Sequence, residues 1–483
     1  MSSPVLTATR RVPLALVLLA TGIPMFMATL DNLVVTNALP VISRELNASV
    51  EELQWLVNAY TLAFAALILM AVALGDRLGR RTVFIAGIAI FTIASAFAAI
   101  STDPTQLIIA RAVQGLGGAG IMPLSLSLLS GAVSAKRRQL AIGIWGGLAG
   151  LGVAVGPLIG GAVVEGWNWQ AIFWINVPVG VIAIPLILWI LPNAFGARVR
   201  LDVLGVALAG FGVLGLVFGI VRGNDAGWDS FEVLDSLIGG GVLIAAFLIW
   251  ESRTTTPLLP LRLFRDRSFA LANVVGFGFS FGMFGAVFIL IQFLQIVQGH
   301  SPLEAALMTT PWTMAPMIVA PLAGIFGGRI GTRNLIVAGL VLQSAGLFGL
   351  AATMTAGVAY TTMLPWFISA GIGMGLVFAP SSTAVLANIV PHDTAKASGS
   401  NSTLREIGIA LGVAVLTAVF TGAGGKLTPT GYVDAAVPAV FVGAAVVLAT
   451  AIFAIFLPAG RAVAHPRTDS IEAIAAKSEF VGV

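Results

Sequence analysis

The sequence of 483 residues contains no cysteine, and only 10% of its residues are charged. Without cysteine the chain has no disulfides, no thiolate metal ligands and no thiol nucleophile. Soluble domains carry roughly 25% charged and 45–50% apolar residues, whereas this chain is 58% hydrophobic with a mean hydropathy of +0.99. A soluble enzyme, a nucleic-acid-binding protein and a disordered scaffold are therefore excluded.

Long apolar runs dominate what is present. They are about 20 residues long, enough for a helix to cross a bilayer core of about 30 Å, and their continuity is unlike the alternating pattern of a porin-type barrel. We predict an all-α polytopic membrane protein with 14 transmembrane helices. The predicted spans are 13–36, 55–74, 82–100, 107–131, 140–163, 171–191, 203–221, 233–250, 270–296, 304–326, 335–353, 360–386, 403–421 and 435–457.

The basic residues predict the orientation, because Lys and Arg are enriched in cytoplasmic loops. With the N-terminus inside, 20 of the 25 Lys and Arg residues fall on the cytoplasmic side. Arg44, Arg222 and Lys426 fall outside, and Arg111 and Arg405 lie within spans. We therefore expect both termini in the cytoplasm of a multi-pass protein of the bacterial cytoplasmic membrane.

An internal repeat divides the chain. Three features recur at offsets of 252, 257 and 260 residues: the turn 75–81 at 327–333, the Gly-rich stretch 115–123 at 371–380, and Ala-Lys at 135–136 and 395–396. Duplicated halves are typical of secondary transporters, which bind substrate near the midplane between the halves. We expect a six-span half over 1–192, two inserted spans over 193–252, a second six-span half over 253–458 and a cytoplasmic tail over 459–483.

Four ionisable residues remain inside spans: Asp31, Arg111, Arg405 and Glu406. Burying such a group costs at least ~2.5–3.5 kcal/mol, so each is a functional candidate. Asp31 is the leading candidate for a carboxyl that binds a proton on one side and releases it on the other; the alternative is a structural cap on a broken helix. Arg111 would tune that acid, or would be a structural ion pair or carbonyl clamp. Glu406 is either a second protonation or cation-binding site, or a local structural partner of Arg405.

Two further motifs indicate conformational roles. In span 5, Gly152, Gly156 and Gly160 form a smooth stripe for close helix approach; Pro157 bends the helix and frees the carbonyl of Val153, and Gly161 follows. The turn after span 2 contains Asp76, Arg77, Gly79 and Arg80. Asp76 could pair there with helix N–H groups or arginines as a latch present in one conformation only, although the arginines alone would also suit an anchor at anionic lipid.

A cavity for a lipophilic ligand is expected to combine an aromatic wall with a few polar groups. Phenylalanines in span 9 fit this description, and lipid-facing filler is the alternative. The candidate cavity residues are Asn32, Gln114, Met122, Phe284, Phe288, Gln292 and Trp312. None of the four lysines lies in a phosphate-binding loop, and no histidine lies in a span. We expect no metal and no cofactor, with the proton motive force as the energy source.

These motifs together resemble the major facilitator superfamily, and specifically its fourteen-span drug:proton antiporters. The turn 75–81 is similar to the cytoplasmic motif of the superfamily, with Val72 where that motif usually opens with glycine. Residues 111–118 resemble the span-4 motif linked to proton transfer, and 152–161 the span-5 motif linked to export. Residues 30–40 and 167–178 resemble stretches of the fourteen-span branch. Residues 312–326 carry no acid, unlike span 10 of some multidrug members, which puts recognition of divalent cations in doubt.

The resemblance implies a proton-coupled antiporter that exports lipophilic, cationic or antibiotic compounds by alternating access. The expected partners are a small-molecule substrate, protons and the lipid bilayer, with no nucleic acid, and the expected functional unit is a monomer. One alternative is a dedicated exporter of one endogenous metabolite or self-made antibiotic. A remote alternative is a membrane lipid-modifying enzyme, which would need an interfacial cluster of His, Asp or Glu that the sequence does not offer.

Overall fold

The computed structural model describes residues 13–196, 201–390 and 393–458. Over these residues the chain is helical and contains no strand. The predicted tail 459–483 and residues 1–12 lie outside the described residues, as do 197–200 and 391–392.

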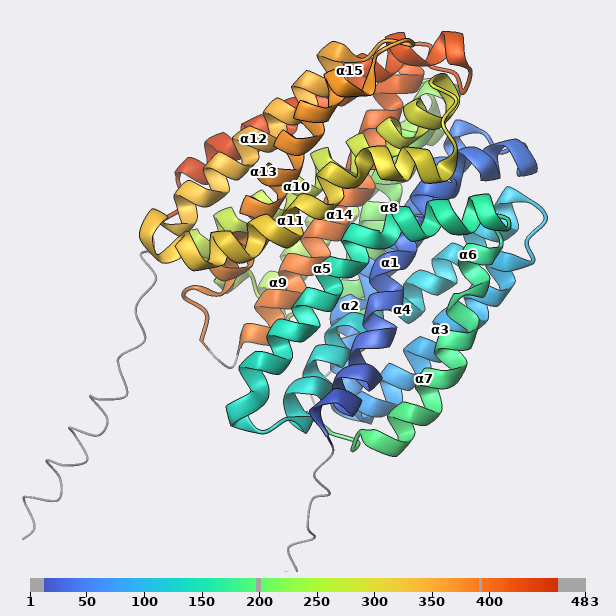
Figure 1. The fold of residues 1–483 in the computed structure, drawn as a ribbon. Coiled ribbons are helices and arrows are strands. Elements are labelled where there is room, and N and C mark those ends of the chain that lie inside the picture. Colours follow the sequence, from blue (N-terminus) through green and yellow to red (C-terminus); the bar gives the residue numbers. More distant parts are fainter. Residues whose placement is uncertain (1–12, 197–200, 391–392, 459–483) are drawn as a thin grey trace, which may run out of the picture.

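Long helices run side by side through the molecule (Figure 1). Thirteen helical segments in the described part are long and apolar enough to cross a membrane. α11 has the length of a span but is not among those thirteen, and it carries three internal prolines. The helices are α1 (Leu14–Leu46), α2 (Val50–Leu78), α3 (Arg80–Ala99), α4 (Pro104–Ala132), α5 (Ala135–Gly166), α6 (Ala171–Trp174), α7 (Asn176–Ile190), α8 (Val203–Ala226), α9 (Phe231–Arg253), α10 (Arg267–Gln292), α11 (Pro302–Ile330), α12 (Thr332–Thr353), α13 (Tyr360–Leu386), α14 (Thr394–Gly422) and α15 (Pro429–Ile455), with short turns η1 (Leu261–Arg265) and η2 (Phe293–Val297).

The two predicted halves pack in the same way. α4 packs against α2 and α3, as α13 packs against α11 and α12, and α1 contacts α5 as α10 contacts α14. In each half a glycine pair lets two helices touch: a Cβ at Gly117 would lie 2.6 Å from the Gly87 carbonyl oxygen, and one at Gly373 would lie 2.5 Å from that of Gly339. The duplicated turns also match, because Gly79 and Gly331 both have positive φ, 105° and 90°.

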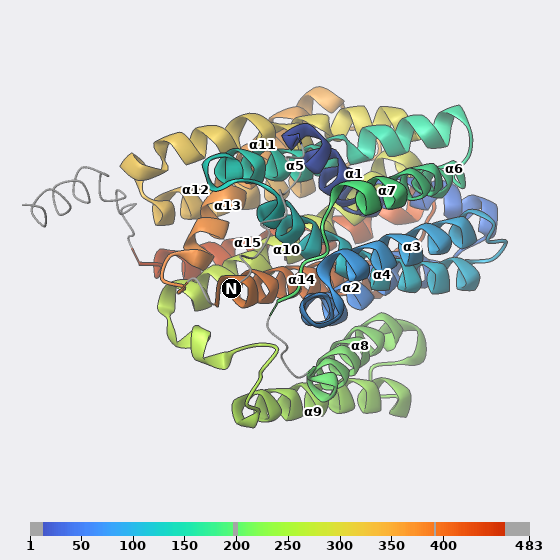
Figure 2. The ribbon, with the colours of Figure 1, turned by 90° about the horizontal axis from the view of Figure 1, so that it is seen from below.

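The two inserted helices, α8 and α9, form a hairpin at the side of the bundle, next to α2 and α14 (Figure 2). Val213, Val217 and Val221 of α8 pack in one cluster with Leu62 of α2 and with Ala410 and Ala414 of α14. Asn224 donates 2.6 and 2.7 Å hydrogen bonds to the Ala418 carbonyl and the Thr421 hydroxyl of α14. Arg222 pairs with Glu51 of α2 at 3.2 Å. α8 thus bridges the seam between the halves.

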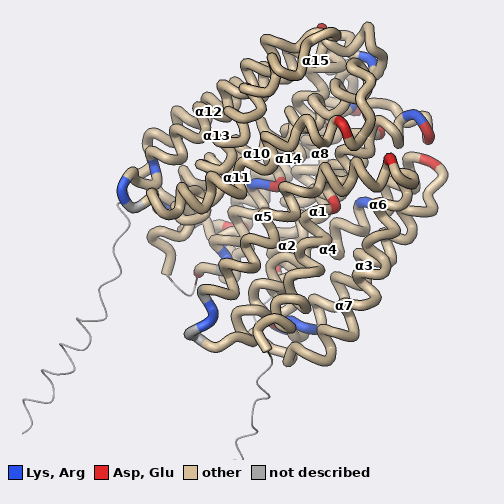
Figure 3. The backbone as a smooth tube through the Cα atoms, in the orientation of Figure 1, with Lys and Arg blue, Asp and Glu red and all other residues tan. Residues whose placement is uncertain are grey.

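Charged segments gather at the two ends of the bundle, with few between them (Figure 3). We call one end the basic end; it carries the arginines of 77–81, 253–267 and 329–333. The opposite end is the acidic end, with most of its carboxylates in 45–52, 225–235 and 304. Successive loops lie at opposite ends of the bundle, and the basic residues gather in every second loop, as the predicted orientation requires.

Between α5 and α11 the halves are closed at the acidic end and apart at the basic end. Near the acidic end Thr313 of α11 donates a 3.2 Å hydrogen bond to the Ala154 carbonyl of α5, and Ser301 donates one of 2.5 Å to Glu165. Toward the basic end α5 and α11 spread apart (Figure 1). There a Cβ added at Gly143, Gly146, Gly147 or Gly150 of α5 would meet open space, and residues of both helices are exposed on several sides. The conformation is therefore open toward the basic end.

Several helix ends differ from the predicted spans. α1 continues ten residues beyond the predicted end at 36. The prediction followed the apolar run, which matches the thickness of the membrane, whereas the helix itself continues until Asn47, whose φ of 52° ends it. α2 begins at Val50 through a capping box between Ser49 and Glu52. Span 6 is broken at Ile175, because Pro178 has no N–H to bond the Trp174 carbonyl.

Candidate functional site

A buried ion pair lies inside the first half. Arg111 of α4 donates a hydrogen bond through Nη1 to Asp31 of α1, and both side chains are at most 1% exposed. The same Nη1 donates to Gln114 Oε1 at 2.9 Å, and Nε donates to the Leu56 carbonyl at 3.1 Å. A guanidinium stays charged in proteins, so the Asp31 carboxyl group lies directly against a fixed positive charge. The structure brings together the two residues that the sequence proposed as proton carrier and tuning arginine.

Three further side chains complete this polar cluster. Asn176 donates a 3.0 Å hydrogen bond to Asp31 Oδ1. Gln114 donates to Ser95 at 2.7 Å and lies 3.4 Å from Asp31 Oδ1. The Arg111 guanidinium lies 4.4 Å from the centre of the Tyr60 ring. Gln114, which was predicted as a cavity residue, is fully buried in this conformation and contacts the ion pair; its role in a cavity stays a prediction.

Sequence reasoning missed Ser95, Asn176 and Tyr60 as partners of this cluster. The signal for Asn176 was its place two residues before Pro178, where the predicted span breaks. That break starts α7 at Asn176, whose amide reaches Asp31. No local pattern marks Ser95 or Tyr60, because each meets the site only through helix packing.

Glu406 and Arg405 of α14 form a second candidate pair. Neither makes a hydrogen bond or ion pair with any residue that the structure describes, and both are partly exposed. No direct ion pair joins the two side chains, although their charges are close enough to interact. Glu406 lies within electrostatic range of the Tyr60 hydroxyl, as do Asp31 and Arg111. Glu406 thus faces the ion-pair cluster from the opposite half.

The glycine stripe of α5 packs as its spacing predicts. A Cβ at Gly160 would lie 2.9 Å from Val34 Cα of α1, and one at Gly156 would lie 3.0 Å from Leu33 Cβ. Gly152 is in looser contact with Phe26. Gly161 instead meets α11, where a Cβ would lie 2.6 Å from the Pro302 carbonyl oxygen. The Gly152–Gly161 segment therefore contacts both halves.

Asn37 of α1 lies at the centre of the closed acidic end. Its amide donates to the carbonyls of Pro157 in α5 and Pro302 in α11, at 3.1 and 3.0 Å. Gln295 of η2 donates to the Asn37 carbonyl at 2.9 Å. We call Asn37, Gly161, Gln295 and Pro302 the acidic-end gate.

The turn after α2 keeps its contacts within the first half. Asp76 accepts a 2.7 Å hydrogen bond from Arg80 Nε, while the exposed side chain of Arg77 makes no hydrogen bond or ion pair with any described residue. The Asp76 carbonyl accepts from Gly196 N, and Arg80 N donates to the Ala194 carbonyl. The turn therefore holds the segment that follows α7. Whether Asp76 changes partners in another conformation stays a prediction.

The remaining predicted cavity residues divide into two groups. Asn32, Met122 and Phe284 are partly exposed. Phe288, Gln292 and Trp312 are at most 1% exposed and lie within the main hydrophobic core or beside it. The buried group is thus unavailable to a ligand in the conformation open at the basic end.

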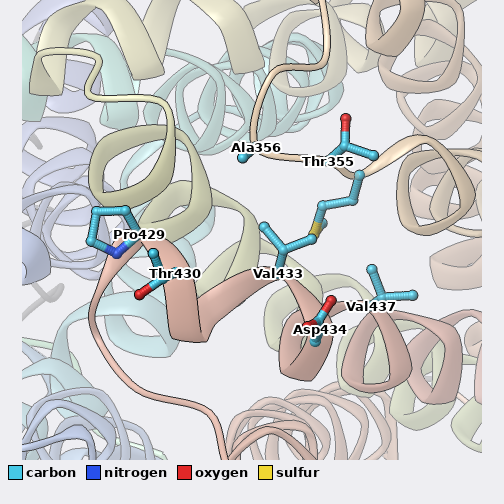
Figure 4. Close-up of a pocket in the computed structure, with 8 residues that line it drawn as sticks. Thr355, Ala356, Pro429, Thr430, Val433, Asp434 and Val437 are labelled. Carbon is cyan, nitrogen blue, oxygen red and sulfur yellow. The ribbon is translucent and has the colours of Figure 1, made fainter.

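A hollow of about 660 Å³ lies elsewhere, near the acidic end (Figure 4). It is formed by the loop after α12 and the start of α15, with Thr355, Pro429 and Asp434 among its lining residues. It contains none of the predicted site residues. In the described part of the chain no three His, Asp or Glu side chains gather as a metal site.

Comparison with known proteins identifies this architecture. The family model of the Major Facilitator Superfamily matches residues 21–413 and 272–481. The chain belongs to the Major Facilitator Superfamily. The protein is therefore a multi-pass membrane transporter and not an enzyme, and the resemblance found in its motifs is confirmed.

Relatives in this superfamily share about a third of the sequence. The chain is 34% identical to the tetracenomycin C resistance and export protein of Streptomyces glaucescens, over 88% of this chain and 79% of the relative. It is 36% identical to the multidrug resistance protein Stp of Mycobacterium tuberculosis, over 84% and 75%. It is 32% identical to the multidrug transporter protein MdtP of Bacillus subtilis, over 85% and 76%.

Solved structures show the same fold at low sequence identity. A bacterial homologue of the human lysosomal transporter Spinster, inward-facing and occupied, matches with a TM-score of 0.66 at 17% identity, over 92% of this chain and 96% of that one. The nucleoside transporter NupG matches with a TM-score of 0.63 at 14% identity, over 92% and 99%. The major facilitator fold expected from the motifs is thus confirmed.

Proposed function

We propose that this transporter is a proton-coupled antiporter that exports lipophilic, cationic or antibiotic small molecules from the cytoplasm. The buried Asp31–Arg111 ion pair supports this proposal most strongly. A buried carboxylate held by one arginine and two amides has two stable forms, ionised and paired or protonated and released. Names of relatives, such as the multidrug resistance protein Stp, support export of drugs.

The orientation follows from the charge of the two ends. The basic end faces the cytoplasm by the positive-inside bias, so the present conformation is open inward. Substrate enters the opening between the halves in this state, with Glu406 as the candidate contact for a positive group. Its binding displaces the proton of Asp31 to the cytoplasm and leaves the carboxylate paired with Arg111.

Alternating access requires the acidic-end gate to open and the basic end to close. In the outward-open state Asp31 takes a proton from outside, which removes its charge and weakens its bond to Arg111. One charge that crosses 100 mV contributes ~2.3 kcal/mol, so one or two protons sustain a steep substrate gradient without ATP. We propose a location in the bacterial cytoplasmic membrane and a monomer as the functional unit.

A dedicated exporter of one metabolite is the second candidate. It is favoured by relatives such as the tetracenomycin C resistance and export protein and the probable actinorhodin transporter of Streptomyces coelicolor. Fold and coupling would be the same in both cases. The two candidates differ only in the breadth of compounds that drive proton movement.

Everted membrane vesicles with an imposed proton gradient and a pH-sensitive dye test the proposal. Substrate added to vesicles with the wild-type protein should release protons, and Asp31→Asn at equal expression should abolish this release. Asp229→Asn is the matched control, since Asp229 is an exposed loop carboxylate near the acidic end. If Asp31→Asn responds like wild type, Asp31 is structural. If a panel of lipophilic cations and neutral antibiotics gives no response, broad export is wrong.

A further inference from the structure

Arg405 is an arginine without a partner in the middle of the bundle. It lies on α14 about halfway between the helix ends, and no hydrogen bond or ion pair joins it to any residue in the described part of the chain. A guanidinium has five N–H donors and remains charged in proteins. Leaving such a group unpaired inside a membrane protein is expensive, which marks it as a functional candidate.

The surroundings fix the position of this side chain. Its guanidinium carbon lies 4.7 Å from the centre of the Phe378 ring of α13. Its aliphatic part runs along α10, where a Cβ at Gly276 would lie 3.1 Å from Arg405 Cγ. Asn401, one turn earlier, is itself held by a 3.1 Å hydrogen bond to Asn273 of α10. The arginine is therefore placed by packing and has all its donors available.

Arg405 remains partly exposed although helices surround α14. α10, α15, α8 and α2 pack around this helix, and Phe378 of α13 lies against Arg405. The contacts with α10 and α13 place Arg405 on the side of α14 that faces these two helices. We infer that its exposed part is reached through the opening at the basic end.

We propose that Arg405 and the Phe378 ring form a subsite for an acidic oxygen on a planar aromatic substrate. Arginine binds carboxylates through parallel N–H donors. The Phe378 ring, which also packs edge-to-face with Phe279, covers one face of the guanidinium, and the other face of that planar group can stack on an aromatic substrate. This subsite extends the proposed transport function. The neighbouring Glu406 side chain leaves the helix about 100° around from Arg405, and the two charges are close enough to interact. The opening thus carries one contact for anions and another for cations.

Two xanthene dyes with the same ring system and opposite charge test the subsite. Fluorescein is anionic and rhodamine 123 is cationic, and their binding to the full-length protein in nanodiscs can be followed by fluorescence anisotropy. Equilibrium binding needs no proton gradient, so a failure here is distinguishable from a failure of proton coupling. The variants are Arg405→Gln, Arg405→Lys and Glu406→Gln, with Arg329→Gln as the control because Arg329 is exposed at the basic end.

Arg405→Gln should weaken fluorescein binding about tenfold or more and strengthen rhodamine 123 binding, because a repelling charge is removed. Arg405→Lys should retain part of the fluorescein affinity, since it keeps the charge and loses the planar donor pair. Glu406→Gln should weaken rhodamine 123 binding without weakening fluorescein binding, and Arg329→Gln should change neither.

Gly276→Ala provides a second variant, which shifts Arg405 without removing its charge and should also weaken fluorescein binding. Equal loss of both dyes in Arg405→Gln, unchanged fluorescein binding in that variant, or no fluorescein binding by the wild type would overturn the proposal.

Discussion

The Asn37 amide of α1 donates a 3.0 Å hydrogen bond to the Pro302 carbonyl at the start of α11. This contact joins the two halves at the acidic end, and Gln295 adds a bond from η2 to the same asparagine. At the opposite end the described residues of α5 and α11 form no equivalent bond, and the glycines of α5 there face open space. The same two helices, α5 and α11, are therefore in contact at the acidic end and apart at the basic end.

Enlarging Gly161 should open the acidic-end gate. A Cβ at this position would lie 2.6 Å from the Pro302 oxygen and 2.7 Å from Leu303 Cα, both backbone atoms. Overpacking of this kind costs ~1–3 kcal/mol, and it acts only on the conformation in which the gate is closed. Gly161→Ala should therefore shift the population toward the state open at the acidic end.

A cysteine at Gly147 reports this shift, since the chain contains no other cysteine. Its labelling by a maleimide should fall in Gly161→Ala, because α5 and α11 then close at the basic end. Gly166→Ala is the control on the same helix, where a Cβ meets nothing within 4 Å. Equal labelling in both variants would show that Gly161 does not control the gate.

The two matched turns should respond unequally to the same substitution. Gly79 and Gly331 both have positive φ, so alanine costs roughly 1–2 kcal/mol at either position. At Gly79 the new Cβ would also lie 2.4 Å from the Asn193 amide, whereas at Gly331 it meets open space. Gly79→Ala should lower the thermal unfolding midpoint of the purified protein more than Gly331→Ala. Equal midpoints would contradict the packing described around Asn193.

Asn224 should stabilise the attachment of α8 to the second half. Asn224→Ala removes two hydrogen bonds to α14, each worth about 0.5–1.5 kcal/mol. The unfolding midpoint should fall, whereas Ser236→Ala should leave it nearly unchanged because the Ser236 hydroxyl bonds only within α9. A midpoint for Asn224→Ala that matches the control would mean that the apolar contacts of α8 hold the seam alone.

Asn176 should support proton coupling although it carries no charge. Asn176→Ala removes a 3.0 Å hydrogen bond to the Asp31 carboxyl group, and a hydrogen bond to a charged group is worth about 1.5–3 kcal/mol. Substrate-driven proton release in everted vesicles should then fall by about tenfold or more at a fixed outer pH. Asn168→Ala is the control, because Asn168 is exposed in the loop before α6. An unchanged rate in Asn176→Ala would remove this residue from the coupling cluster.

Much of this architecture could be predicted from local patterns. The apolar runs predicted the positions of the helices, and the recurring turn at Gly79 and Gly331 predicted the two related halves. Because few charges lie inside the spans, Asp31 and Arg111 stood out as candidates. Helix ends were less predictable from hydropathy, as α1 shows by continuing to Leu46. The capping box at Ser49 and Glu52 was visible in the sequence and would have placed the start of α2 correctly.

Contacts between distant helices could not be predicted. Asn37 meets Pro302 across 265 positions, and Asn176 meets Asp31 across 145, so no local pattern encodes either bond. Phe288 and Trp312 are buried in the conformation that is closed at the acidic end. A transporter sequence encodes at least two conformations, so a local pattern cannot predict which residues are buried in one of them. The role of α8 became apparent only from its position over the seam between α2 and α14.

Proton release from the purified protein tests the central claim most directly. In a weakly buffered solution with a pH indicator, substrate is added to the wild type, Asp31→Asn and Asp229→Asn, and the protons released per molecule are counted. Rhodamine 123 serves as the probe. The wild type and Asp229→Asn should release protons on binding, whereas Asp31→Asn should bind the dye without releasing any. Undiminished release from Asp31→Asn would contradict the account and assign proton coupling to another group.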